Sequence, residues 1–220
     1  MSISRRTLLK AGVAMAMTAG TAGAATSQVF VVHTTDRADG IRRGLAALGA
    51  PAAGGKRVVI KPNLNSADLF PASTHMDTLG MLVRHFQAAG AREITVADRS
   101  GMGDTRRVMA QKGVLALAGE LDFRTVVLED TPMEGWAEEL LTGSHWSRGV
   151  LFARLFREAD LIVQTCCLKT HRYGGHFTLS LKNSVGMVAK YSPRDSYNYM
   201  GALHGSSHQL AVWPLKLDEA

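Results

Sequence analysis

The sequence is poor in the residues that build common metal and redox centres. It has two cysteines, Cys166 and Cys167, which are neighbours in the chain. Adjacent cysteines rarely form a disulfide, because the bridge needs a strained peptide bond. They fall in an apolar run, which favours small buried core residues. Since no cysteine spacing resembles a zinc ribbon or a ferredoxin cluster site, the chain carries no iron–sulfur ligand set.

Three other kinds of motif are missing. No Gly-x-Ser-x-Gly elbow is present, which argues against a serine hydrolase triad. Gly101 and Gly103 begin a dinucleotide-binding pattern, but Arg106 stands where the third glycine is needed. Lysine and arginine are not clustered with aromatic residues, which make up 6% of the chain, so we expect no nucleic-acid binding.

The N-terminus has the features of a twin-arginine export signal. Arg5-Arg6 is followed by Leu8-Leu9, then by a short apolar run at 11–19 and by the small residues of a cleavage site at 22–24. That run is shorter than the roughly 20 apolar residues that span a bilayer, and no later run is apolar enough to do so. We therefore expect residues 1–27 to be a signal peptide and the mature protein to be periplasmic or extracytoplasmic, without a transmembrane span.

Two alternatives to an exported protein remain open. The arginine pair could occur by chance in a cytoplasmic protein, or the segment could stay in place as an anchor. The twin-arginine route carries folded chains, so a cofactor inserted in the cytoplasm or an export partner is compatible with it. The formal net charge is +6, and the signal holds three of the positive charges and no acid, so the mature chain is only mildly basic at +3.

Short apolar runs alternate with helical patterns through residues 28–220, which we expect to form a single domain. Continuous apolar strands separated by helices are typical of a parallel sheet that is buried on both faces. The pattern therefore predicts a Rossmann-like, three-layer α/β fold with helices on both faces of a mostly parallel sheet. We expect strands at 29–32, 57–60, 93–97, 123–128 and 161–166, and helices at 41–48, 77–89, 105–121 (broken near Gly113), 151–158 and 178–189.

Polar residues follow several of the expected strands. Open α/β sheets bind ligands outside the carboxyl ends of their strands. Lys61 and Asn63 follow the second strand, Asp98 follows the third, and Lys169 and His171 follow the fifth. We expect these side chains to gather into one crevice that holds a small anion, with Lys61 close to His171.

The segment from 169 to 186 combines a glycine-rich turn with an expected helix. If that helix begins near Thr178, its free N–H groups favour an anion, and Lys182 four residues later shares the same face. Asn183 comes next in the chain. The alternative is a solvated lysine that follows a glycine-rich surface loop.

Four histidines fall in the last third of the chain, and together they suggest a divalent metal. Imidazole is a common metal ligand, and Asp98 or Asp130 could add an oxygen. Isolated surface histidines are the alternative, because the Gly-Ser-Ser spacer before the last of them is a poor helix. The candidate metal ligands are His171, His176, His204 and His208.

Several of these segments together resemble a known family, DUF362. The resemblance covers about residues 29–208 and rests on five stretches: 59–64 (VIKPNL), 96–100 (VADRS), 159–163 (ADLIV), 168–171 (LKTH) and 178–186 (TLSLKNSVG). The family comprises bacterial and archaeal proteins without a settled function. Some members carry ferredoxin-type iron–sulfur modules, and some carry a twin-arginine signal.

Two departures from the family pattern affect what the resemblance implies. Members usually continue with further strands and an acidic, glycine-rich segment, so the resemblance implies a domain that is incomplete at its C-terminus. Cys166 and Cys167 also stand where members more often have a small apolar residue and proline. Because no iron–sulfur ligand set is present, that cofactor does not carry over.

Three functional hypotheses follow. The first is an exported enzyme, or enzyme remnant, that holds a small anion and a divalent metal. In it Asp98 and His171 act as acid–base or metal groups, and the ligand-binding residues are Lys61, Asn63, Lys169, Thr178, Lys182 and Asn183. The second is a non-catalytic binding or redox-partner module, in which Lys61 and Asn63 only tie loops together. The third is a chain that does not fold alone, because its sheet exposes an apolar edge.

Overall fold

A computed structural model describes residues 28–140, 142, 146–170 and 178–204. By its internal contacts the chain divides into two units, residues 1–31 and 32–220, and the helices and strands described below belong to the second. Residues 29–32 were expected to form a strand, but they have no regular secondary structure. A β-branched run becomes a strand only when a neighbouring strand pairs with it, and this run has no such partner among the described residues.

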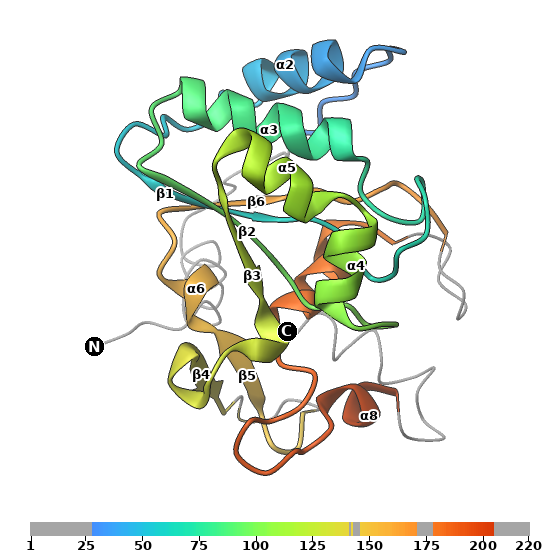
Figure 1. Cartoon of the computed structure of the whole chain (residues 1–220), viewed down its shortest axis with the longest axis vertical. Helices are drawn as coiled ribbons and strands as arrows, with labels where there is room; N and C mark the ends of the chain where they lie inside the picture. Colours follow the sequence, from blue (N-terminus) through green and yellow to red (C-terminus); the bar gives the residue numbers. More distant parts are fainter. Residues whose placement is uncertain (1–27, 141, 143–145, 171–177, 205–220) are drawn as a thin grey trace, which may run out of the picture. The chain divides into compact units, whose positions relative to one another are not determined.

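Four parallel strands form the central sheet, in the order β3-β2-β1-β6 (Figure 1). Their bounds confirm four of the expected strands: β1 (Arg57–Lys61), β2 (Glu93–Asp98), β3 (Arg124–Val127) and β6 (Leu161–Gln164). Because all four run the same way, their carboxyl ends lie along one edge of the sheet. Lys61 at the end of β1 is in register with Gln164 at the end of β6.

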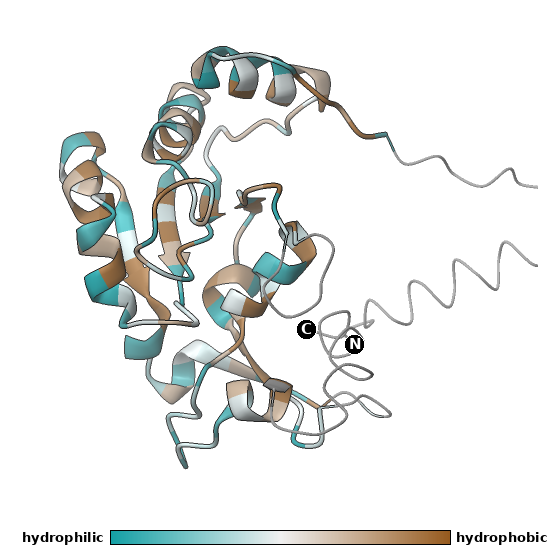
Figure 2. Ribbon diagram, turned by 90° about the vertical axis from the view of Figure 1, so that its right-hand side faces the viewer, coloured by the Kyte–Doolittle hydropathy of each residue, from teal (hydrophilic) through white to brown (hydrophobic). Residues whose placement is uncertain are grey.

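Helices cover one face of the sheet. Val58 and Ile60 of β1 pack with Leu79, Val83 and Phe86, whose helical spacing predicted this buried face. The expected helix break is confirmed, since Gly113 has a φ of 80° between the two shorter helices. Figure 2 shows how apolar and polar residues alternate along these helices. The elements on this side are α3 (Met76–Ala88), α4 (Thr105–Gln111) and α5 (Val114–Leu121), with α2 (Arg37–Ala47) packed on α3.

The second face carries a different set of elements. Val59 and Ala97, which point opposite to Val58 and Ile60, pack in a second apolar cluster with Trp136 and Phe156. A hairpin-like antiparallel pair, β4 with β5, takes part in this layer. The elements are η1 (Leu128–Asp130), η2 (Met133–Gly135), β4 (Trp136–Glu139), β5 (Val150–Ala153), α6 (Arg154–Arg157), α7 (Ser180–Asn183), η3 (Ser184–Met187) and α8 (Tyr199–His204). The result is the expected α/β fold, with a parallel sheet between two layers.

Two expected helices are wrong in extent. Residues 150–153 form β5 instead of a helix, because they pair with β4 and bury apolar side chains, and only Arg154–Arg157 is helical. The helix expected at 178–189 is limited to α7, followed by the 3-10 turn η3. Thr178 precedes it and forms an isolated bridge with Lys169. No helix within the described ranges is long and apolar enough to cross a membrane.

Candidate functional site

Lys61 and Asp98 form a buried ion pair at the carboxyl ends of β1 and β2. The Nζ atom of Lys61 lies 2.5 Å from Oδ1 of Asp98, and each residue is about 1% exposed. The ammonium also donates to the carbonyl oxygen of Pro62 at 2.7 Å and to Oδ1 of Asn183 at 3.2 Å. These three acceptors match the three protons of a lysine ammonium. Lys61 is therefore committed to the protein and has no proton left for a ligand.

The acid of the pair is equally well satisfied. Oδ2 of Asp98 accepts the backbone N–H of Leu64 at 2.8 Å, and Oδ1 accepts that of Arg99 at 2.6 Å. Burial lowers the pKa of Lys61, and the Asp98 carboxylate opposes that shift. Buried charges persist when both partners are fully hydrogen-bonded, because otherwise their desolvation dominates. The ion pair thus connects the carboxyl ends of β1 and β2 inside the protein.

The segment that contains α7 and η3 also contacts the ion pair. Nδ2 of Asn183 donates to the backbone oxygen of Lys61 at 3.1 Å. The side-chain amide of Asn183 is therefore hydrogen-bonded to both the ammonium and the main chain of Lys61. Gly186 lies against the pair: a Cβ at this position would be 2.6 Å from Cε and 2.7 Å from Nζ of Lys61, and 2.9 Å from Oδ1 of Asp98. Glycine is required here by the space available.

Arg99 holds the same segment from the end of β2. It is 4% exposed, and its guanidinium donates through Nε to the carbonyl of Val188 at 3.0 Å and through Nη2 to that of Val185 at 2.6 Å. Burial lowers the pKa of Arg99, while Asp98 and Glu129 oppose the shift. These bonds tie η3 and the residue that follows it to the end of β2.

Lys182 is the cation at this edge that the fold leaves unpaired. It lies in α7 and is partly buried, and within the described ranges its ammonium forms neither a hydrogen bond nor an ion pair. Burial, together with the positive charges of Arg99, Lys169 and Lys61, lowers the pKa of Lys182 to about 8. Lys169, which contributes to this field, donates to the carbonyl of Ala72. Positive charge here therefore exceeds negative charge.

Asn63 and Thr178 have structural contacts. The backbone N–H of Asn63 donates to Oγ1 of Thr74 at 2.9 Å, and its Oδ1 accepts from the N–H of Asn65 at 3.3 Å. Thr178 is buried, and its N–H donates to the carbonyl of Lys169 at 2.7 Å. Both residues hold loops at the carboxyl edge. For Lys61 and Asn63, this is the loop-tying role of the second hypothesis.

The candidate metal ligands fall outside the part of the chain that can be described. This holds for His171, His176 and His208, and for the side chain of His204 at the end of α8. The expected proximity of Lys61 to His171 stays a prediction for the same reason. Within the described ranges, no group of three His, Cys, Asp or Glu side chains could hold a metal ion.

The two cysteines are free thiols. Cys167 is buried, as expected for a core residue, and its Sγ lies 3.3 Å from the carbonyl oxygen of Ser73. Cys166 is only partly buried. Burial raises the pKa of Cys166 and of Cys167, so both favour the protonated thiol at neutral pH.

The structure brings Lys61, Asp98 and Asn183 into contact, as their places in the sequence suggested, and their ligand-binding and catalytic roles stay predictions. The sequence did not single out Arg99. Its only signal was its place directly after Asp98 at a strand end. Gln164 was also missed: its Nε2 donates to Oγ of Ser184 at 3.0 Å. Its Oε1 is a buried acceptor without a partner in the described part of the chain. A polar residue at the end of a parallel strand would have been the clue.

Comparison with known proteins gives one match. Residues 58–211 match the family described as a domain of unknown function, DUF362, and this range includes the Lys61–Asp98 pair, Asn183 and Gly186. No curated protein and no solved structure matches the chain. Because the matched range covers more than half of the sequence, the chain belongs to the DUF362 family.

Proposed function

We propose that this protein binds a small anion at the carboxyl ends of the sheet strands, with the ammonium of Lys182 as the main contact. The supporting observation is an unpaired, partly buried ammonium among other cations. Asp98 forms its ion pair with Lys61, and it pairs with neither Lys182 nor Lys169 within the described ranges. A bound anion would supply the missing negative charge and favour the charged lysine.

The other residues predicted for this site divide into two roles. Lys169 adds to the positive field around Lys182, and His171, which follows it in the sequence, is proposed as a further contact. Lys61, Asn63, Thr178 and Asn183 position the strand ends and loops around the anion. An unpaired cation of shifted pKa in such a place is typical of a functional site.

The catalytic and metal roles stay predictions. A proton-transfer role for Asp98 would require it to leave Lys61, and we therefore propose the binding function without it. A divalent metal on the four histidines is tested by metal analysis of protein purified from the exported fraction. Stoichiometric metal would support the enzyme hypothesis, while metal-free protein that still binds an anion would favour the binding module.

Calorimetric titration with inorganic phosphate tests the anion site. We expect Lys182→Met to weaken phosphate binding by at least tenfold, because a charge-assisted hydrogen bond contributes about 1.5–3 kcal/mol. The matched control is Lys56→Met, which removes one positive charge just before β1, at the opposite edge of the sheet. Equal phosphate affinity in the wild type and in Lys182→Met would refute the proposal.

We also propose that the chain is exported by the twin-arginine route. The supporting observation is the Arg5-Arg6 motif, followed by an apolar run and small residues. Replacing both arginines by lysine should keep the protein in the cytoplasmic fraction. Unchanged appearance in the periplasmic fraction would contradict this route.

A further inference from the structure

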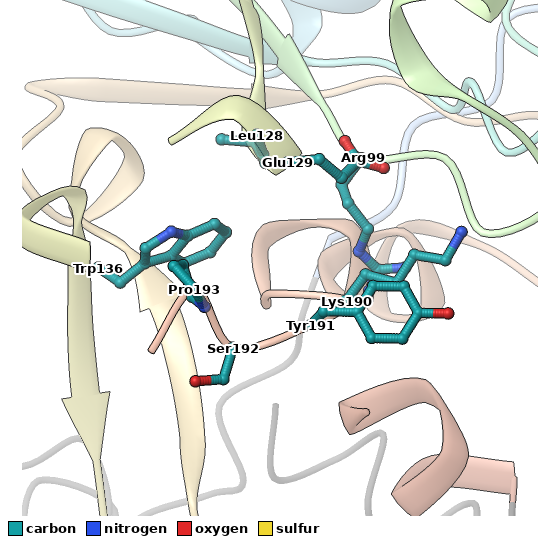
Figure 3. A pocket seen from close by; sticks show the side chains of 8 residues that line it. All are labelled: Arg99, Leu128, Glu129, Trp136, Lys190, Tyr191, Ser192 and Pro193. Atoms are coloured by element: carbon teal, nitrogen blue, oxygen red, sulfur yellow. The ribbon is translucent and has the colours of Figure 1, made fainter. Parts of the chain in front are cut away.

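A pocket of about 140 Å³ lies beside the ends of β2 and β3 (Figure 3). Arg99 contributes from the end of β2, Glu129 from η1, Trp136 from β4, and Lys190 from the segment after η3. Of the residues assigned to the anion site, only Arg99 reaches this pocket. The pocket therefore offers a separate binding surface.

Two cationic side chains of the pocket have N–H groups without an acceptor among the described residues. The hydrogen bonds of Arg99 use Nε and Nη2, so the two N–H groups of Nη1 have no acceptor among the residues described. Lys190 likewise has neither a hydrogen bond nor an ion pair through its ammonium in the described ranges, and its Nζ lies 5.9 Å from the ring centroid of Tyr191. A guanidinium edge and an ammonium are the donors that carboxylates prefer.

One acid lines the same pocket without pairing with either cation. Oε1 of Glu129 accepts the hydroxyl of Thr105 at 2.7 Å, and no ion pair joins it to Arg99 or Lys190. Partial burial raises the pKa of Glu129, while the hydrogen bond from Thr105 and the charges of Arg99 and Lys190 oppose the shift. With two cations and one acid, the pocket favours an anion. Arg99, Lys190 and Glu129 together leave one net positive charge, which an anion with a single negative charge neutralises.

The rest of the wall is apolar. Trp136 lines the pocket although it is only 3% exposed, and because its indole N–H donates to the carbonyl of Thr131 at 3.0 Å, the small part that reaches the pocket offers a ligand apolar contact. Pro193, which is exposed, extends this apolar wall, while Leu128 lines the pocket as a fully buried side chain. Figure 3 shows Trp136 and Pro193 on one side of the pocket, with Arg99, Lys190 and Tyr191 on the other. An inorganic ion would leave this apolar wall unused, whereas a flat carbon body would cover it.

We infer that this pocket binds a small organic monocarboxylate with a flat apolar body. Its carboxylate contacts Arg99 and Lys190, and its body packs against Trp136. The inference does not depend on the anion site at Lys182, since Lys190 lines this pocket and Lys182 does not.

Titration of the full chain with sodium benzoate, followed by calorimetry and tryptophan fluorescence, tests this inference. We expect saturable binding of benzoate, with acetate at least fivefold weaker because it cannot cover Trp136. Lys190→Met should weaken benzoate binding at least fivefold, since it removes one of the two cations. Glu129→Gln should strengthen it, because it removes a negative charge beside the carboxylate. The control Lys56→Met should bind benzoate like the wild type.

Four results would overturn the inference. They are the absence of saturable benzoate binding, equal affinity for acetate and benzoate, wild-type affinity in Lys190→Met, and weaker binding in Glu129→Gln. None of them bears on the phosphate site, which is tested by Lys182→Met. Arg99 is left unchanged in this series because it also holds the backbone of η3.

Discussion

Lys61 and Asp98 are the last residues of neighbouring parallel strands, and their side chains meet at 2.5 Å in the protein interior. Parallel pairing aligns the ends of β1 and β2, so two residues 37 positions apart in the numbering share one buried place. The pair also fixes the next layer, through the amide of Asn183 and the close approach of Gly186. It thereby sets the position of Lys182.

Breaking the pair from one side should be costly. Asp98→Asn leaves the Lys61 ammonium buried without a counter-charge, and we expect a loss of about 3–5 kcal/mol in the free energy of unfolding. Urea denaturation followed by circular dichroism measures it. The double variant Lys61→Met with Asp98→Asn should be more stable than the sum of the two single losses predicts. Additive losses would show that the two side chains do not interact.

Gly186→Ala should destabilise the protein by about 1–3 kcal/mol. Its Cβ would meet buried atoms of Lys61 and Asp98 at less than 3.0 Å, and moving either side chain would disturb their ion pair. The control is Gly119→Ala in α5, where nothing lies within 4 Å and alanine is the better helix former, so a gain of roughly 0.5–1 kcal/mol is expected. Thermal unfolding compares the two. A Gly186→Ala protein as stable as the wild type would contradict the close packing.

Lys182→Met should raise stability at pH 7. The pKa of Lys182 is lowered in the folded protein to about 8, so the unfolded state binds more protons between pH 8 and the ordinary lysine pKa. Stability therefore rises with pH through that window, and below pH 8 the folded state carries the full cost of the buried charge. Methionine removes this cost, and we expect a gain of roughly 1–3 kcal/mol at pH 7 that shrinks toward pH 10. Urea denaturation at both pH values checks it, and a loss of stability at pH 7 would contradict the burial cost.

Anion affinity should fall as Lys182 loses its proton. Sulfate keeps a constant charge across neutral and mildly alkaline pH. Any change in sulfate affinity with pH therefore comes from the titration of protein groups. With the pKa of Lys182 at about 8, we expect sulfate affinity to drop about tenfold between pH 7 and pH 9. Calorimetry in buffers of different ionisation enthalpy should also show proton uptake near pH 8. A flat profile would mean that Lys182 does not hold the anion.

Thiol reactivity should be low at neutral pH for both cysteines. Burial raises the pKa of Cys166 and of Cys167, and the thiolate is the reactive form. Cys166 should be alkylated first, because Cys167 is buried beside the carbonyl of Ser73. Timed alkylation with peptide mass spectrometry resolves the order, with the unfolded protein as the reference for full reactivity. Faster labelling of Cys167 would contradict this arrangement.

The strands of the central sheet could be predicted because each is a continuous apolar run between helical patterns. The four strands of the sheet and helix α3 lie within a few residues of their expected positions. Residues 150–153 could not be predicted in the same way, since an apolar run of this length fits a helix or a strand equally well. Pairing with β4 decided it.

The meeting of polar residues at the carboxyl edge of the sheet was predictable in part, while the anion site itself stays a proposal. Lys61, Asp98 and Asn183 were chosen because they follow strands or sit in the Lys-Asn motif, and they do meet. Which lysine is structural and which is available to a ligand was not predictable, because the sequence does not show which lysine forms an ion pair with a carboxylate. Arg99 was missed since its backbone partners, Val185 and Val188, lie nearly ninety residues further along the chain.

By itself the sequence determined the alternation of elements, the parallel sheet and the edge at which the polar residues gather, because these follow from local apolar pattern and chain connectivity. The tertiary structure alone decided that Lys61 is neutralised and Lys182 is not. In the sequence each lysine is followed closely by an asparagine, Asn63 or Asn183. The two lysines differ in how deeply they are buried and in their distance from Asp98. The charge state and availability of a side chain depend on its neighbours in space, and those are set only when the layers pack.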